Sequence, residues 1–212
     1  MNFTELSKIS QKLLIFNRSA LRNLEVSRDV LSGNIKYWLK QKKIIGLKNG
    51  WYVLADKYRR AQDKAGYLEY IANQLVQPSY LSVEYVLAKY QILSEPVNAL
   101  TSVTTKTSRE IINDLAAFRF YSLSPKLFFG YKIMPCQGAP IFMAEKPKAL
   151  FDFLYLRFLK GRPINERSVI NLRLNWENIS VADFKKARGY LKPIKSRRLS
   201  LLFSIIERQY YA

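Results

Sequence analysis

Residues 44–54 read IIGLKNGWYVL. Two short runs of β-forming residues, 44–48 and 51–54, lie on either side of the dipeptide Asn49-Gly50. Asn-Gly between two such runs is the strongest short-range signal for a β-hairpin, because both residues of the preferred turn need a positive φ. The stretch therefore predicts a tight antiparallel hairpin.

The residues before the hairpin indicate short helices. Apolar residues recur at three- and four-residue steps, which is the spacing of one helical face: Phe3, Leu6, Ile9, Leu13 and Phe16. A polar break at residues 17–19 supplies an N-cap for a second helix. That helix carries Ala20, Leu21 and Leu24.

A third helix follows a tight turn over residues 25–27. Ser27 can cap it, and the pattern extends to about Lys43. Its inner face consists of Leu31, Ile35, Trp38 and Leu39. Three short helices and then a hairpin within about 55 residues is the order of a winged helix-turn-helix. The alternative is a small helical domain with an added hairpin.

Residues 55–66 (ADKYRRAQDKAG) are polar and predict a domain boundary. We therefore expect a DNA-binding domain over 1–56 and a larger domain over 66–212. In the larger domain the patterns indicate helices over 67–76, 82–90, 145–159, 181–191 and 196–210. Short β-branched or aromatic runs indicate strands over 99–105, 118–123, 131–136 and 140–143. The expected class is α+β: a winged helix-turn-helix, then a domain with a short antiparallel sheet and C-terminal helices.

The charge balance predicts a polyanionic partner. Lys and Arg number 35 against 16 Asp and Glu, which gives a net charge of +19. Through Lys64 the balance is 14 − 5 = +9, and over the remainder it is 21 − 11 = +10, so the N-terminal unit has the higher charge density. Double-stranded DNA fits this excess. A solvated basic surface that aids solubility is the alternative.

The third helix and the hairpin supply the predicted DNA contacts. In such motifs the second helix enters the major groove, and its N-terminal and outward residues face base edges. Arg28 can pair with two guanine acceptors, Gly33 permits close approach, and the lysines can contact phosphates. The predicted set is Ser27, Arg28, Asp29, Ser32, Gly33, Lys36, Tyr37, Lys40, Lys42, Lys43, Lys48 and Asn49.

A second basic stretch lies near the C-terminus and has no acidic residue. Its members are Lys185, Lys186, Arg188, Lys192, Lys195, Arg197 and Arg198. It is either a second polyanion contact, to DNA backbone or an acidic partner protein, or a solvated helix face. Membrane binding fits less well, because core contact explains the face of Leu201, Leu202, Ile205 and Ile206 more simply.

Little in the sequence favours catalysis. The chain has no His and one Cys, Cys136, which excludes the usual zinc sites and His-dependent triads. A buried or incidental thiol is expected there. The acids Glu110, Asp114, Glu145 and Asp152 form no tight nuclease pattern with Lys146 or Lys148, and the first two are expected on an exposed helix face. We expect no enzyme, cofactor or metal. The sequence shows no membrane-spanning run or signal peptide, so a cytoplasmic location is expected.

Three stretches carry a family resemblance: KNGWY (48–52), PSYLS (78–82) leading into VLAKYQIL (86–93), and AEKPKALFD (144–152). In these stretches and their order the sequence resembles the AbiEi antitoxins of type IV toxin–antitoxin systems, over most of residues 1–160. Pro147 stands where the family has Glu. The resemblance implies a winged domain that represses its own operon at promoter repeats. It also implies a C-terminal domain that counters a nucleotidyltransferase-like toxin.

The resemblance brings no catalytic residues. It leaves Lys148 and Asp152 either as part of a surface used against the toxin or as an ordinary i, i+4 charge pair on an exposed helix face. Two further readings remain open. One is a transcription regulator whose second domain senses a ligand or dimerises, with no toxin partner. The other is a nucleic-acid enzyme such as a restriction-type nuclease.

Overall fold

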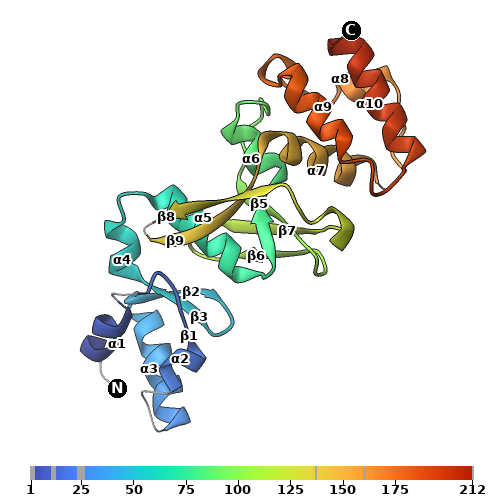
Figure 1. Cartoon of the computed structure of the whole chain (residues 1–212). Helices are drawn as coiled ribbons and strands as arrows, with labels where there is room; N and C mark the ends of the chain where they lie inside the picture. The colour runs from blue at the N-terminus through green and yellow to red at the C-terminus, as the bar shows by residue number, and fades with distance from the viewer. Residues whose placement is uncertain (1–2, 11–12, 23–26, 137, 160, 212) are drawn as a thin grey trace.

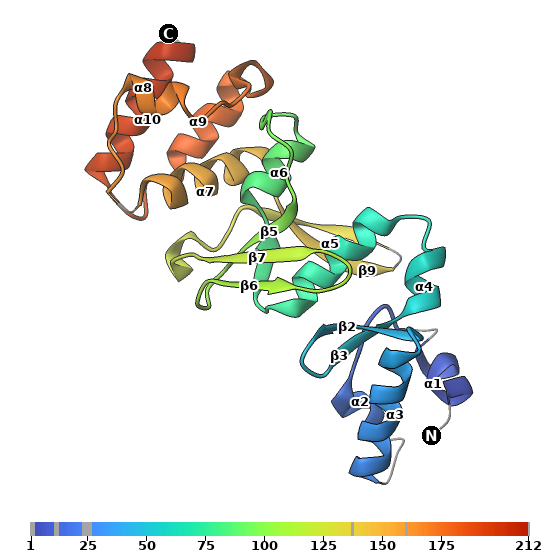
Figure 2. The ribbon, with the colours of Figure 1, turned by 180° about the vertical axis from the view of Figure 1, so that it is seen from behind.

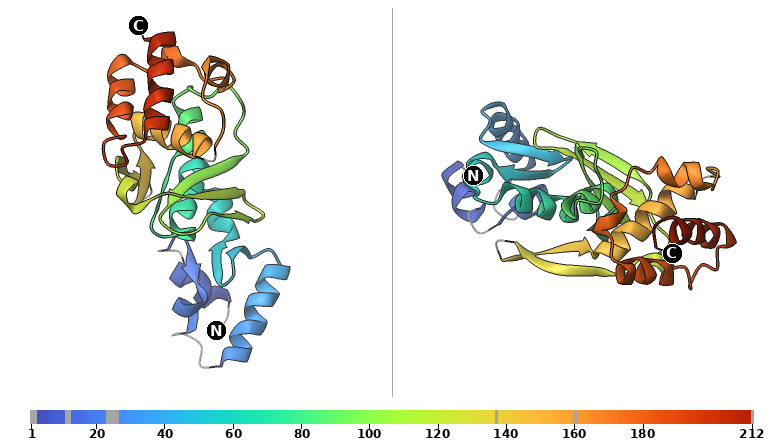
Figure 3. Two further views of the ribbon diagram at one scale, coloured as in Figure 1. Left: turned by 90° about the vertical axis from the view of Figure 1, so that its right-hand side faces the viewer. Right: turned by 90° about the horizontal axis from the view of Figure 1, so that it is seen from above.

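The protein is elongated, with helical units at its two ends and a large β-sheet between them (Figure 1). The computed structural model describes residues 3–10, 13–22, 27–136, 138–159 and 161–211. The N-terminal and C-terminal segments lie at opposite ends in perpendicular views as well (Figure 3). Mixed helices and strands of this kind confirm the α+β class.

The N-terminal unit is a winged helix-turn-helix. In chain order it contains α1 (Phe3–Ser10), β1 (Phe16–Asn17), α2 (Arg18–Arg22), α3 (Arg28–Lys40), β2 (Ile44–Lys48) and β3 (Trp51–Leu54). The three strands form an antiparallel sheet in the order β1-β3-β2. The helices and the hairpin were predicted, whereas β1 was not.

The predicted first helical face was too long. Phe16 belongs to β1, where it pairs with Tyr52, and the side chain of Leu13 is exposed. Pairing with β3 overrides the helical spacing, because a two-residue strand completes the sheet edge. The predicted positions Leu24 and 25–26, and the side chain of Ile9, lie outside the described residues.

Two short polar side chains cap α2 and α3 as expected. The Asn17 carboxamide oxygen accepts the backbone N–H of Ala20 at 2.8 Å, and the Ser27 hydroxyl accepts that of Val30 at 3.4 Å. Helix α3 buries Leu31, Ile35 and Trp38 against the core of the winged unit. Leu39, predicted on this inner face, is instead exposed, so the buried stripe of α3 is narrower than predicted.

The hairpin forms at Asn49-Gly50, but its turn differs from the expected one. Gly50 has a φ of 74°, whereas Asn49, which the structure also describes, is not among the positive-φ residues. A type I′ turn would need both. The Gly50 carbonyl accepts the backbone N–H of Arg18 at 2.8 Å, and the register shifts between Gly46 and Lys48. The turn therefore joins the two strands and also binds the start of α2 through the Gly50 carbonyl.

The second unit contains a six-stranded sheet in the order β6-β7-β5-β4-β9-β8. The strands are β4 (Ser79–Leu81), β5 (Ala99–Thr104), β6 (Arg109–Ile112), β7 (Ala117–Ser122), β8 (Tyr131–Cys136) and β9 (Ala139–Ala144). The sheet is mixed rather than antiparallel, because β5 pairs with β7 and β4 with β9 in parallel. The four predicted strands are present. Two short ones, β4 and β6, were missed, and their insertion produces the parallel pairs.

Helices flank this sheet and continue to the C-terminal end (Figure 2). They are α4 (Ala55–Arg60), α5 (Lys64–Leu75), α6 (Val83–Lys89), α7 (Lys146–Phe158), α8 (Glu166–Ile170), α9 (Val181–Gly189) and α10 (Arg197–Tyr210), with 3-10 turns at Pro125–Leu127 and Trp176–Asn178. The helix α10 buries Leu202 and Ile206, as core contact predicts, but Leu201 is 54% exposed.

The hairpin β2–β3 is buried on both faces. Ile44, Tyr52 and Leu54 belong to the core of the winged unit. Leu47 and Val53 belong to the main core, which is the larger hydrophobic cluster formed mostly by the six-stranded sheet and the helices around it. Residues 55–66, predicted as a polar boundary, form α4 and the start of α5, and Tyr58 packs edge-on against Tyr67. A strand covered on both faces has a continuous apolar run rather than an alternating one. The run WYVL at 51–54 carried that signal.

Candidate nucleic-acid interface

The outward face of α3 is open to solvent. Arg28, Asp29, Gly33, Lys36, Tyr37 and Lys40 are all exposed there. Apart from Gly33, its two chain neighbours and the adjacent backbone of α3, no described atom lies within 4 Å of the place where a Cβ on Gly33 would stand. Val30 and Tyr37 are 50% and 54% exposed, so the face also carries apolar surface that suits the methyl group of thymine. The structure thus brings these predicted contact residues onto one surface.

Ser32 is held by its neighbours within the protein. Its hydroxyl donates to the Arg28 carbonyl at 2.7 Å and accepts a hydrogen bond from the guanidinium of Arg18. Arg18 therefore lies beside the outward face of α3, although it comes from α2. Sequence reasoning treated Arg18 only as part of a capping segment. Its position beside the hairpin turn is the feature that places its charge on this surface.

The lysines after α3 lie at the base of the same unit. The ammonium of Lys43 lies 4.8 Å from the ring centroid of Phe3 and 6.0 Å from that of Tyr37. Lys42 has a φ of 52°, and its carbonyl accepts from Arg59 at 3.5 Å. Both lysine side chains are exposed. They extend the basic surface from α3 toward α1 and α4.

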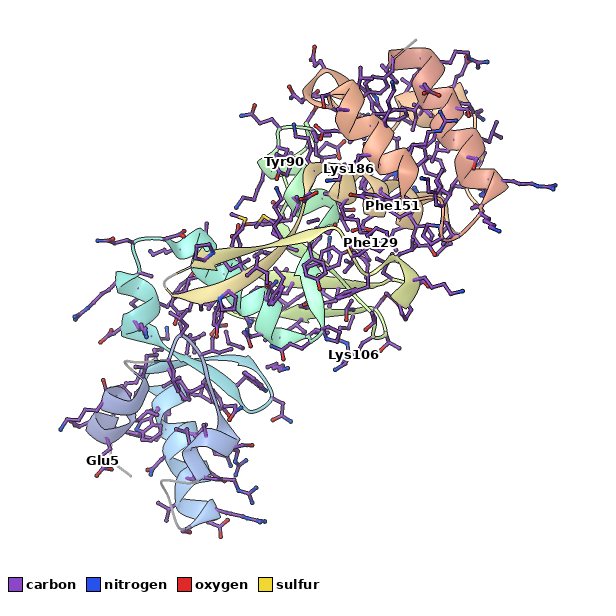
Figure 4. The ribbon with its side chains drawn as sticks, viewed as in Figure 1. Glu5, Tyr90, Lys106, Phe129, Phe151 and Lys186 are labelled. Atoms are coloured by element: carbon purple, nitrogen blue, oxygen red, sulfur yellow. The ribbon has the colours of Figure 1, made fainter. Side chains whose placement is uncertain are left out.

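Lys48 does not lie on this surface, contrary to the prediction for the wing tip. Its ammonium donates to the Leu75 carbonyl at 2.5 Å and lies 4.9 Å from the Trp51 ring centroid. Burial lowers the pKa of Lys48, and the charges of Lys106 and Arg109 lower it further. Lys106, labelled in Figure 4, belongs to the second unit. Lys48 therefore faces the second unit, and of the two predicted tip residues only Asn49 is exposed.

The second basic stretch lies at the other end of the molecule, on α9, α10 and their connection (Figure 1). Three of its cations have partners: Lys186 pairs with Glu145 at 2.5 Å, Arg188 pairs with Glu207, and Arg198 donates to the carbonyls of Phe158 and Arg162. The residues Lys185, Arg188, Lys192 and Lys195 line a shallow depression of about 450 Å³. This stretch cannot simply extend the α3 surface, because the whole sheet lies between them.

The acidic residues considered for metal binding occupy separate places. Glu110 lies on the strand β6 rather than on a helix, and it accepts from Arg119 at 2.7 Å. Asp114 lies in the loop between β6 and β7, and Glu145 pairs with Lys132 and Lys186. Within the described ranges, no group of three or more Cys, Asp and Glu could hold a metal ion. Cys136 is buried, and burial raises the pKa of its thiol.

Lys148 and Asp152 form a fully buried ion pair, which corrects the expectation of an exposed pair. Their side chains are 0% exposed, and the Lys148 ammonium lies 2.6 Å from Asp152 Oδ1. The other carboxylate oxygen accepts from the hydroxyls of Tyr80 at 3.0 Å and Ser82 at 2.8 Å. Burial lowers the pKa of Lys148 and raises that of Asp152, while each charge opposes the shift of the other.

Aromatic rings surround the Lys148 ammonium. It lies 4.9 Å from the ring centroid of Phe129 and 5.0 Å from that of Phe151, with Tyr80 and Tyr190 within 6 Å. Phe129 and Phe151 lie where the sheet meets the C-terminal helices (Figure 4). The segments 78–82 and 144–152, far apart in sequence, thus meet in one buried cluster. Burial of this kind rules out a contact surface made by Lys148 or Asp152 themselves.

No family model matches the chain, and no curated protein matches it. None of the helices in the described ranges is long and apolar enough to cross a membrane.

Proposed function

We propose that this chain is a DNA-binding antitoxin and transcriptional autorepressor, which binds its own promoter through α3 and counteracts a nucleotidyltransferase-like toxin. The observation that carries the DNA-binding part is the exposed outward face of α3 within a winged helix-turn-helix. Arg28 at the first turn suits bidentate pairing with guanine, and Lys36 and Lys40 suit phosphate contacts. The net charge of +19 favours such a partner.

The antitoxin part of the proposal rests on the three stretches that resemble AbiEi antitoxins. Two of them contribute the side chains of the buried Lys148–Asp152 cluster, so they act together in holding β4 against α7. This supports a shared scaffold for the second unit rather than a set of contact residues. The surface that would meet a toxin must then be built from other, exposed side chains of that unit.

A mobility-shift titration tests the repressor. The full chain is titrated on its own upstream promoter and on a scrambled duplex of equal length, at two salt concentrations. We expect tighter binding to the promoter. Arg28→Ala should reduce that preference, and Lys126→Ala, an exposed cation remote from α3, is the matched control. Equal, salt-sensitive binding to both duplexes would contradict the proposal.

Co-expression tests the antitoxin. The chain is produced together with a nucleotidyltransferase-like protein encoded beside it, and growth is recorded with and without the chain. We expect the chain to restore growth. If no such neighbouring reading frame exists, or if growth is not restored, the alternative stands: a transcription regulator whose second unit senses a ligand or dimerises, with no toxin partner. A cleft between α6, β7 and α7 in that unit favours the ligand-sensing form of this alternative.

A further inference from the structure

The second unit contains a cleft between α6, β7 and α7, elements that lie together in Figure 2. Its volume is about 540 Å³, within the range of small-molecule sites. Its lining includes Val83, Glu84, Tyr121, Phe153, Leu156 and Arg157. A second depression of about 300 Å³ shares Glu84, Phe153 and Arg157 with it. These three residues therefore lie between two adjacent depressions.

Glu84 brings an unsatisfied acceptor to this cleft. Its Oε2 is buried and has no hydrogen-bond partner among the described residues. Burial raises the pKa of this carboxyl, an effect opposed by its own backbone N–H, Arg157, Thr101 and Arg119. A buried acceptor without a donor is costly. Because Glu84 lines the cleft, a rotation of its side chain toward the cleft brings Oε2 within reach of an entering donor.

Arg157 brings the opposite charge to the same cleft. It lies on α7, its guanidinium carbon is 5.6 Å from the ring centroid of Phe153, and its side chain is exposed. None of the ion pairs in the described part of the chain joins Arg157 to Glu84. A carboxyl group and a guanidinium group thus line one cleft and influence each other through their charges, but they form no ion pair within 4.0 Å, and Arg162 adds a second cation to the lining.

The backbone at the floor of the cleft is strained. Val83, a β-branched residue, has a φ of 61°. The preceding Ser82 is fixed by its bond to Asp152, by its N–H to the Thr101 carbonyl at 3.1 Å, and by its carbonyl, which accepts from the Thr101 hydroxyl at 2.6 Å. Such strain persists where surrounding bonds impose it, and it is concentrated at ligand sites. The buried cluster therefore holds the cleft in shape.

We propose that this cleft binds a small zwitterion of the α-amino-acid class with an apolar side chain. The ammonium group donates to Glu84, and the carboxylate accepts from Arg157. The side chain packs against Phe153 and Leu156. A plain anion would leave Glu84 Oε2 unsatisfied, and a plain cation would leave Arg157 unused. The proposal does not depend on DNA binding, and its test measures the ligand directly.

Calorimetric titration of the full chain with L-leucine and with L-phenylalanine tests the class of ligand. Two matched compounds each lack one charge: 4-methylpentanoate has no ammonium, and 3-methylbutylamine has no carboxylate. We expect saturable binding of at least one amino acid, and binding of each matched compound weaker by roughly tenfold or more, because each loses a charge-assisted hydrogen bond. Lack of saturation by both amino acids at millimolar concentration, or equal binding of a matched compound, overturns the proposal.

Two variants test whether the ligand binds in this cleft. Glu84→Gln should weaken binding of the amino acid roughly tenfold and leave 4-methylpentanoate binding unchanged, since that compound has no ammonium. Arg157→Met should weaken binding of the amino acid roughly tenfold and leave 3-methylbutylamine binding unchanged, since that compound has no carboxylate. Lys64→Ala, at an exposed position at the start of α5 outside the cleft lining, is the control, and the unfolding midpoint without ligand checks that each variant is folded. If Glu84→Gln weakens both compounds equally, or neither, the ammonium does not meet Glu84 and the proposal fails.

Discussion

Two helices, α3 and α7, each carry a pair of charged residues four positions apart, but the two pairs lie in opposite environments. On α3, Lys36 and Lys40 are four residues apart and face solvent. On α7, Lys148 and Asp152 are also four residues apart, and both are 0% exposed. An i, i+4 spacing places two side chains on one helix face, but it does not say what covers that face. For α7 the cover is β4, which supplies Tyr80, and the segments just before β8 and just after α9, which supply Phe129 and Tyr190.

The largest expected effect comes from breaking the buried pair. Asp152→Ala should lower the free energy of unfolding by about 3–5 kcal/mol, because Lys148 would remain buried without a counter-charge. Denaturant unfolding of the full chain measures this. Asp56→Ala is the matched control, because Asp56 pairs with Arg59 and their side chains are 73% and 59% exposed. For this variant we expect the free energy of unfolding to change by about 0.5 kcal/mol or less. Similar losses in both variants would contradict the burial of the Lys148–Asp152 pair.

The next largest effect concerns the hairpin shared by the two units. Leu47→Ala removes a side chain of the main core that the winged unit contributes, and it should cost about 2–5 kcal/mol. Since the hairpin contributes to both cores, unfolding followed by circular dichroism in the far ultraviolet and by Trp38 fluorescence, in a background where Trp51 and Trp176 are replaced by Phe, should stay coincident. Two separate transitions would instead show that the winged unit unfolds independently.

A smaller effect is expected on DNA. Arg28→Ala should cost about 1–3 kcal/mol on the preferred promoter sequence and relax specificity at one base pair. Competition binding against a set of single-base variants of the promoter measures both. Unchanged affinity and unchanged preference would mean that Arg28 does not contact a base.

The smallest expected effects on DNA binding concern two lysines of the winged unit, Lys40 and Lys48. Lys40→Ala should weaken binding to any sequence and reduce the salt dependence by about one unit, as expected for one lost phosphate contact. Lys48→Ala should leave the salt dependence unchanged, because the Lys48 ammonium bonds the Leu75 carbonyl instead. Titrations at several salt concentrations separate the two. Equal slopes for both variants would place Lys48 on the DNA surface after all.

Local signals identified much of the winged unit. Ser27 and Asn17 cap the helices that their side chains predict, and the Asn-Gly signal places the hairpin at residues 49–50. The strand β1 was missed because two residues have no periodicity. The strands β4 and β6 are three and four residues long, and they were missed for a similar reason. Without them the parallel pairs of the sheet could not be deduced.

Some residues of the candidate sites could be named from the sequence, and others only from the fold. The exposed residues of α3 could be named from the sequence, because a surface helix separates its polar and apolar faces by a regular period. Arg18 joins them only through the fold, since its guanidinium meets Ser32 across fourteen positions of the chain. The cleft at Glu84 and Arg157 had no sequence signal, because its walls come from three elements up to about seventy residues apart.

The sequence by itself determined the charge excess, the caps, the hairpin and most helices, because each depends on residues within a few positions of one another. Only the tertiary structure decided that Lys48 faces the second unit, that Lys148 and Asp152 are buried, and that Glu84 Oε2 lacks a donor. The physical reason is that solvation of a charge depends on which distant segments pack against it. Local spacing sets the face on which a side chain lies, and packing sets whether that face meets water.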